Sequence, residues 1–402
     1  SGWEAVVVDN FLRDKPVAII AYGEVQNQRR SGKRPYEFAA EVMEQLLNRT
    51  GLKNSDIDGL ATHMPTAEAG NTFYTNTMAD NLGLQPRWTQ LTDIGGCSPM
   101  GNIARAAAAI ITGQCEMAIC LASDSTGTTG VGHRRLGGYR QEFMEPIGFQ
   151  GPPVAFGLLS HAYDQKYGLN LNALAQLAVT QRNGAIGNEN AIEQFRKPIT
   201  IQDYLTSRVI AEPIRLLDCV MRCDGGNGLL ITSTERAKAM GFKNLVYPIS
   251  YSEITNFDPS DPNPDITETG FSIVGPDVFK KVGMTPSDID MFHPYDDFLI
   301  AVMLQIEQIG FCNRGEGGDF ILNTDMSPNG KLPLNTGGGQ ISAGQPGLGG
   351  GGVNLTEAIR QLMGEASGRQ VENAKNALVT GIGVIPYFRN WGSSNCMILE
   401  SS

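Results

Sequence analysis

The chain reads GLKNSDID over residues 51–58 and GMTPSDID over residues 283–290, an offset of 232 residues. Each copy is typical of a loop that leads into a short strand entering the core. An amphipathic helix precedes the first copy, because segment 38–46 carries apolar residues at helical spacing. A shorter helical segment, 277–282, precedes the second copy. The repeat therefore predicts two copies of one α/β unit.

A second, looser correspondence supports the duplication. A helix at 103–111 and an apolar strand at 117–122 correspond to a helix at 355–363 and a strand at 377–380. Both helices follow glycine-rich loops. Fully apolar strands that alternate with helices indicate sheets covered on both faces.

We therefore expect an α/β protein with an N-terminal half at 1–245 and a C-terminal half at 246–402. The natural packing of two such halves is a five-layer α/β/α/β/α sandwich. Residues 126–215 depart from the repeat, and we expect them to form a lid-like insertion over the end of the first half.

Composition limits the function classes. The 402 residues are 41% hydrophobic and carry a net charge of −11 with scattered Lys and Arg, which argues against nucleic-acid binding. No apolar run is long enough to span a bilayer. Seven cysteines, an odd number without a visible secretion signal, predict reduced thiols and a cytoplasmic protein.

Cys97 is the strongest candidate for chemistry. It lies in the run DIGGCSPMG at 93–101, directly before the small-residue helix. The unpaired N–H groups of a helix start favour thiolate over thiol, so we expect a lowered pKa and a nucleophile. The alternative is a buried cysteine in an alanine-rich core helix, the common fate of free cysteines.

These features together resemble the thiolase superfamily over nearly the whole chain. The duplicated halves, the cysteine that heads a core helix and the glycine-rich loop at 337–352 all match. The spacing from Cys97 to Gly113 and the segment 208–218 are most similar to the sterol-carrier-protein-x type of thiolase. The resemblance implies that Cys97 attacks the 3-oxo carbonyl of an acyl-CoA and forms an acyl-enzyme. Coenzyme A is then a co-substrate, and neither a permanently bound cofactor nor a metal is expected.

The sequence departs from the family pattern at three places. Thiolases carry a Gly-His-Pro motif where this chain has Gln345 after Gly344, and a glutamine cannot accept a proton. The sterol-carrier type carries His-Asp-Cys-Phe where this chain reads YDDF at 295–298. The turn from Gly381 to Gly383 lacks the second cysteine of ordinary thiolases.

Proton transfer therefore depends on His293, Tyr295 or Asp297, each of which could instead have a structural role. An aspartate in a dry pocket can shuttle protons. A tyrosine is better suited to donate a proton to an enolate than to act as a base. His293 alone among the three has an ordinary pKa near neutrality. Gln345 could polarise a thioester carbonyl. The resemblance implies that Gly344, Gly381 and Gly383 lie at the substrate and oxyanion side of the site.

Of three possible functions, we favour the first and keep the other two as alternatives. The first is CoA-dependent thiolysis of a 3-oxoacyl-CoA, with benzoylsuccinyl-CoA of anaerobic toluene breakdown as one possible substrate. The second is a retro-aldolase similar to steroid side-chain aldolases, which use tyrosines and need no nucleophilic cysteine. The third is a non-catalytic scaffold subunit. The resemblance implies a homodimer core, and relatives often work with a separate small zinc-ribbon and OB-fold subunit, which we also expect here.

Overall fold

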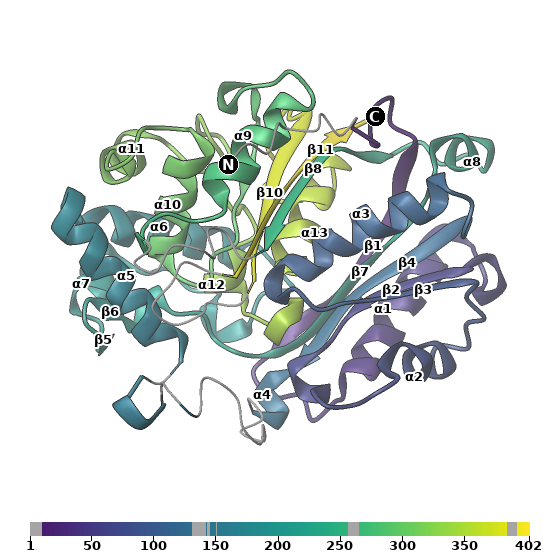
Figure 1. The fold of residues 1–402 in the computed structure, drawn as a ribbon, viewed down its shortest axis with the longest axis horizontal. Helices are drawn as coiled ribbons and strands as arrows, with labels where there is room; N and C mark the ends of the chain where they lie inside the picture. Colours follow the sequence, from purple (N-terminus) through teal and green to yellow (C-terminus); the bar gives the residue numbers. More distant parts are fainter. Residues whose placement is uncertain (1–9, 131–141, 143–144, 150, 256–264, 384–391) are drawn as a thin grey trace.

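The computed structural model describes residues 10–130, 142, 145–149, 151–255, 265–383 and 392–402 (Figure 1). Its strands form a nine-stranded sheet in the order β3-β2-β4-β7-β1-β8-β11-β10-β9 and a short two-stranded ribbon of β5 and β6. The nine strands are β1 (Val17–Gln28), β2 (Gly59–His63), β3 (Trp88–Thr92), β4 (Met117–Ser125), β7 (Asp224–Ser233), β8 (Val246–Thr255), β9 (Phe292–His293), β10 (Asn376–Ile382) and β11 (Ser393–Ser401). The predicted α/β class is confirmed.

The strand order shows the duplication directly. In the first half, β2 is parallel to β3 and β4, while β7 is antiparallel to β4 and β1. In the second half, β9 is parallel to β10, and β11 is antiparallel to β10 and β8. An isolated parallel bridge between Phe292 and Leu334 takes the place that β3 has in the first half. The two halves meet at a single paired position, Ile19 with Val246.

The repeated sequence performs the same task in each half. Its first aspartate closes a 3₁₀ turn, because Asp56 accepts a 2.8 Å bond from Lys53 N and Asp288 accepts one of 2.8 Å from Thr285 N. Its last aspartate accepts a backbone hydrogen bond from the first residues of a central strand that comes later in the same half. Asp58 Oδ1 accepts Met117 N at 2.9 Å, and Asp290 Oδ2 accepts Asn376 N at 3.1 Å.

Two helices form the central layer. They are α3 (Ser98–Ile111) and α13 (Gly351–Leu362), which contact each other and strands of both halves. They share one apolar core with the strand faces turned toward them, including Ile19, Leu355 and Met397. Helix α1 (Pro35–Thr50) covers the outer face of the first half, and α9 (Phe271–Lys280) and α10 (Leu299–Ile309) cover the second (Figure 1). This is the layering that the sequence predicts.

The insertion packs differently from the prediction. Its main helices are α5 (Pro152–Tyr167), α6 (Leu171–Ile186) and α7 (Ile201–Thr206), and its residues 131–141, 143–144 and 150 lie outside the described part. Helix α6 packs against α10, α11 (Gly317–Asn323) and α12 (Gly339–Ala343), all from the second half (Figure 1). The expectation that the insertion covers the first half is therefore wrong for α6. The division at residues 245 and 246 remains an interpretation.

Smaller helical elements complete the described chain. They are α2 (Tyr74–Asn81), α4 (Thr126–Thr129) and α8 (Thr234–Ala239). The ribbon strands are β5 (Val209–Ala211) and β6 (Ile214–Arg215).

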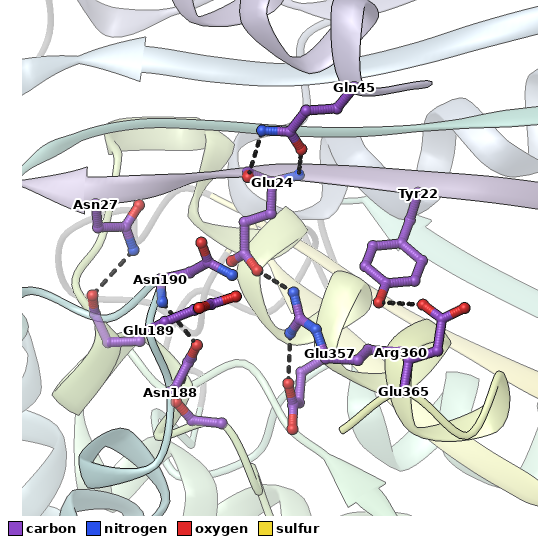
Figure 2. A network of polar contacts seen from close by, with 12 residues as sticks. Tyr22, Glu24, Asn27, Gln45, Asn188, Glu189, Asn190, Glu357, Arg360 and Glu365 are labelled. Atoms are coloured by element: carbon purple, nitrogen blue, oxygen red, sulfur yellow. Dashed lines mark hydrogen bonds and ion pairs between the residues drawn. The ribbon is translucent and has the colours of Figure 1, made fainter. Parts of the chain in front are cut away.

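A buried ion-pair network ties α13 to strand β1 (Figure 2). Arg360 pairs with Glu24 of β1 and, at 2.6 Å, with Glu357 one turn earlier on its own helix. Arg369 also pairs with Glu357, at 2.8 Å. Because all four side chains are buried, each charge depends on its partner. The network fixes the position of the helix whose first residue, Gly351, packs on the backbone of Gly96.

Candidate active site

Cys97 lies where the 3₁₀ turn η3 (Gly95–Cys97) passes into α3, and its side chain is fully buried. Asn395 of β11 donates a 2.9 Å hydrogen bond from Nδ2 to the Cys97 carbonyl. Gly381 of β10 packs directly on the cysteine, because a Cβ at Gly381 would lie 2.8 Å from Cys97 Cα. The two strands of the second half thus hold the helix start of the first half.

The environment of Cys97 keeps its thiol protonated. Burial raises the pKa of the Cys97 thiol well above its ordinary value, and the nearby Glu253 and Cys396 raise it further. The Asn395 contact and Arg105 act in the opposite direction and are weaker. The predicted lowering of this pKa is therefore wrong, because loss of water around a thiolate outweighs the favourable dipoles.

Tyr295 comes from the second half and its ring lies against the backbone beside Cys97. A side chain at Gly96 would collide with the Tyr295 ring and hydroxyl. Tyr295 N donates 2.9 Å to Thr380 Oγ1, and its carbonyl accepts a 2.7 Å bond from Gln305 Nε2. Burial, and then the carboxylate of Asp297, raise the pKa of Tyr295 well above its ordinary range. Tyr295 is therefore a neutral phenol, and hydrogen bonds to its backbone hold the residue in place.

Gln345 contacts the hydroxyl group of Tyr295. Its Nε2 donates to Tyr295 Oη at 3.4 Å and to Gln340 Oε1 at 3.1 Å. Its backbone is held on both sides, since Gln345 N donates 2.9 Å to the Met221 carbonyl and the Gln345 carbonyl accepts Cys223 N at 3.0 Å. The structure therefore brings Cys97, Tyr295 and Gln345 together, as the sequence motifs lead one to expect.

Two adjacent aspartates have different surroundings. Asp296 accepts Gln340 N at 2.9 Å and Ile341 N at 3.1 Å at the start of α12, and it also accepts a 2.9 Å bond from Asn354. Asp297 Oδ1 is enclosed without a hydrogen-bond partner in the described part of the chain. Burial, and then the charge of Asp296, raise the pKa of Asp297 to about 8. Asp297 is thus an acid–base group poised near neutral pH.

Two of the three predicted glycine donors are already occupied. Gly344 N donates 3.0 Å to the Gln340 carbonyl, and Gly383 N donates 2.8 Å to the Ser393 carbonyl. Neither N–H is therefore free to bind a substrate oxyanion, the role that the resemblance implies for these glycines. Gly381 instead provides close packing against Cys97.

His293 lies apart from this group. It faces a small cavity lined by Asn354, Glu357 and Arg360, and neither ring nitrogen has a hydrogen-bond partner among the described residues. Burial lowers the pKa of His293 to about 4. The ring is therefore neutral at pH 7, and Cys97 does not line its cavity.

His63 of the first half occupies the place that the repeat offset assigns to Tyr295. It lies beside the turn before α13, where a Cβ at Gly349 would be 3.3 Å from His63 Cε1. Burial lowers the pKa of His63 to about 4.

Sequence reasoning missed a polar group on the other side of Cys97. Asn395 Nδ2 also donates 3.1 Å to Tyr251 Oη, which in turn donates to Glu253. Glu253 accepts two 3.1 Å bonds from Arg105 on α3. The signal available was an asparagine within the apolar stretch of the last strand, which requires a buried partner.

Among the described residues, no group of three or more His, Cys, Asp and Glu side chains could hold a metal ion. No described helix combines the length and the apolar character that a membrane crossing requires. All seven cysteines are free.

Comparisons with known proteins agree with this architecture. A family model described as thiolase C-terminal domain-like matches residues 257–399. The steroid side-chain-cleaving aldolase of Thermomonospora curvata is 31% identical, over 91% of this chain and 95% of its own. The 17-hydroxy-3-oxo-4-pregnene-20-carboxyl-CoA lyase of Mycobacterium tuberculosis is 30% identical, over 91% of this chain and 96% of its own. A solved Ltp2-ChsH2(DUF35) aldolase is 28% identical with a TM-score of 0.83, covering 96% of this chain and 98% of its own.

Proposed function

Because the chain belongs to the thiolase superfamily, in the branch of the sterol-carrier-protein thiolases, we propose that it is a lyase that cleaves a β-hydroxyacyl-CoA by a retro-aldol reaction. The observation that carries the proposal is the contrast between two groups in one site. Cys97 is a buried neutral thiol, and the two motif positions where thiolases carry a histidine and a second cysteine hold Gln345 and the turn 381–383 instead. Burial holds the pKa of Tyr295 well above its ordinary value and raises the pKa of Asp297 to about 8, so these two groups can serve as acid and base.

The full-length relatives support this choice over thiolysis. Both are named for carbon–carbon cleavage, and each aligns over 91% of the chain. The steroid substrates in their names belong to those proteins. For this chain we propose only the reaction class and a CoA thioester as substrate.

The proposed reaction begins at the β-hydroxyl group of the substrate. The Asp297 carboxylate accepts the hydroxyl proton, a new carbonyl forms at that carbon, and the adjacent carbon–carbon bond breaks. Its electron pair remains on the α-carbon of the CoA thioester as an enolate. Asp297 is suited to this task because its raised pKa gives a stronger base than an ordinary aspartate.

Tyr295 then serves as the hydrogen-bond and proton donor to the enolate. Gln345 Nε2 points its N–H at the phenol oxygen, so the Tyr295 O–H stays available for the substrate. The enolate gains one proton and becomes a simple acyl-CoA, while the hydroxyl carbon leaves as a ketone or aldehyde. No acyl group is transferred to Cys97 in this scheme.

Exchange of α-hydrogens tests the proposal without knowledge of the carbonyl product. Propionyl-CoA incubated with the protein in D2O should gain deuterium at its α-carbon, which mass spectrometry detects. We expect Cys97→Ala to retain exchange within about threefold. Tyr295→Phe should lose roughly 100-fold or more, the cost of removing one enolate donor.

Thiolysis is the second candidate, because Cys97 keeps the position of a nucleophile at the start of α3. Under thiolysis of a 3-oxoacyl-CoA such as benzoylsuccinyl-CoA, intact-mass analysis would show an acyl adduct on Cys97, and Cys97→Ala would lose all activity. That pair of results would contradict the lyase proposal.

We further propose that coenzyme A enters only as part of the substrate and that no cofactor is permanently bound. A DUF35 protein accompanies the aldolase in the solved complex, which supports a separate small subunit for this chain as well. A homodimeric core and a cytoplasmic location, consistent with seven free thiols, complete the proposal. A chain that is fully active as a purified homodimer would contradict the need for the small subunit.

A further inference from the structure

Arg182 on α6 is a buried cation without a carboxylate partner among the described residues. Its side chain is only 5% exposed, and Nε donates a 3.2 Å bond to Ser342 Oγ. The guanidinium lies over the Phe195 ring, 4.4 Å from the ring centroid. The other deeply buried arginines, Arg360 and Arg369, both pair with Glu357.

An unpaired buried charge is costly, because water around it has been replaced by apolar groups. Burial accordingly lowers the pKa of Arg182. An anion that enters from outside would supply the missing partner.

Arg182 lines a cavity of about 270 Å³ between α6, α12 and segment 216–221. Apart from Arg182 and Ser342, the walls are mostly apolar side chains: Phe195, Ile199, Leu216, Leu217 and Val220. The volume equals that of roughly nine liquid water molecules, which suits a single ring or a short branched chain. Apolar walls with one cation favour an organic group that carries one negative charge.

The cavity shares a wall with the candidate active site. Cys219 lines the cavity and forms an isolated bridge with Phe298, the residue after Asp297. Met221 also lines it, and its carbonyl accepts Gln345 N at 2.9 Å. Burial and the charge of Asp218 raise the pKa of Cys219, and the charge of Asp297 adds a smaller effect. A substrate held at Tyr295 and Asp297 therefore has this cavity as its neighbour.

We propose that this cavity binds an apolar group that carries a carboxylate, with Arg182 as the counter-ion. This inference rests on the proposed function, under which the bound group is part of the CoA thioester substrate. The substrate class is then an acyl-CoA that carries a second, free carboxylate. The phosphates of coenzyme A fit less well, because they are strongly hydrated and the walls offer few polar partners.

Binding of small probes to the full chain tests the inference without turnover. Isothermal titration should show that benzoate binds and that Arg182→Gln weakens it roughly tenfold or more, the effect of losing a charge-assisted hydrogen bond. Neutral benzamide should bind both proteins equally weakly. Equal benzoate affinity in both proteins, or none in the unaltered protein, would overturn the proposal. Inorganic phosphate that binds more tightly than benzoate would also overturn it, in favour of a phosphate site.

Two further variants separate this inference from folding and from the lyase reaction. Val220→Trp should fill the cavity and reduce benzoate binding while leaving Arg182 in place. Tyr295→Phe should bind benzoate like the unaltered protein even though it has lost exchange. If Arg182→Gln fails to fold, loss of benzoate binding in a folded Val220→Trp protein still supports the cavity, and unchanged binding contradicts it.

Discussion

At the scale of single residues, the missing side chain of Gly96 is what allows Tyr295 to lie beside Cys97. Gly96→Ala would place a methyl group in steric clash with the Cε2, Cζ and Oη atoms of Tyr295, so the phenol must move. We expect α-hydrogen exchange to fall roughly 100-fold, the cost of a misplaced catalytic group. Gly187→Ala is the matched control, because nothing lies within 4 Å of a Cβ there. Equal exchange rates in the two variants would contradict this role of Gly96.

Asp297 gives the proposed reaction its pH dependence. Only the carboxylate accepts a proton, and its pKa is raised to about 8. The pH profile of carbon–carbon cleavage of a β-hydroxyacyl-CoA should therefore rise about tenfold per pH unit below about 8 and level off above it. Asp297→Asn should remove that rising limb. A profile that is already flat from pH 6 upward would show that another group is the base.

Asp297 should lower the free energy of unfolding at neutral and alkaline pH, because its pKa is raised in the folded chain. The carboxyl binds its proton more tightly in the folded chain than in the unfolded chain, where the pKa is about 3.9. Stability is thus lost as the pH rises from about 4 to about 8. We expect Asp297→Asn to raise the free energy of unfolding at pH 8 by a few kcal/mol and to leave it nearly unchanged at pH 4. Urea unfolding measures this, with the exposed Glu44→Gln as control.

The positions of the site residues could be read from the sequence, but their ionisation could not. The motifs place Cys97, Tyr295 and Gln345 in one site, where the structure also has them. The pKa of Cys97 depends on burial by β10 and β11, about 280 residues later in the chain. Such desolvation is a property of tertiary packing, which local sequence does not reveal.

At the scale of elements, α13 depends on its buried charges. Arg360→Met would leave Glu24 and part of Glu357 without their partner. We expect a loss of about 3–5 kcal/mol in the free energy of unfolding, as for other broken buried ion pairs. Lys166→Met removes an exposed pair with Asp265 and should cost less than about 1 kcal/mol. Chemical denaturation of both variants checks this, and similar losses would contradict the structural role of the network.

The observed boundaries of helices and strands show which elements the local sequence pattern can predict. Strand β4 and helix α3 match the predicted apolar runs, because continuous apolar sequence marks a central element. Helix α9 begins at Phe271, six residues before the predicted segment, since Pro276 interrupts the sequence pattern within the helix. Gly225 and Gly226 belong to β7, although paired glycines are typical of a turn. A Cβ at Gly226 would lie 2.8 Å from Phe38 Cβ, so the strand needs glycine to pass beneath α1.

At the scale of the whole molecule, the two halves share the core around α3 and α13. Strand pairing between them is limited to one position, so this shared apolar core is what holds them together. We expect fragments 1–245 and 246–402 to be unfolded when expressed separately and to assemble when expressed together. Circular dichroism and size-exclusion chromatography distinguish these states. Cooperative thermal unfolding of either fragment alone would contradict the prediction.

The duplication was visible in the sequence because both copies need the same aspartates to close the same turn. The placement of the insertion was not, because its neighbours α10, α11 and α12 lie over 100 residues further along the chain. Contacts of this kind carry no local periodicity, so a single sequence offers no signal for them.

The meeting of Cys97 from one half with Tyr295 from the other has an evolutionary consequence. A single copy of the repeat could not have assembled this arrangement within one chain. The ancestor that preceded the duplication must have paired with itself, and it then possessed two equal sites related by its dyad. Gly349 beside His63 marks where the second of those sites would lie. Fusion into one chain allowed the two sites to diverge, so that Tyr295 and His63 now occupy equivalent places with different side chains.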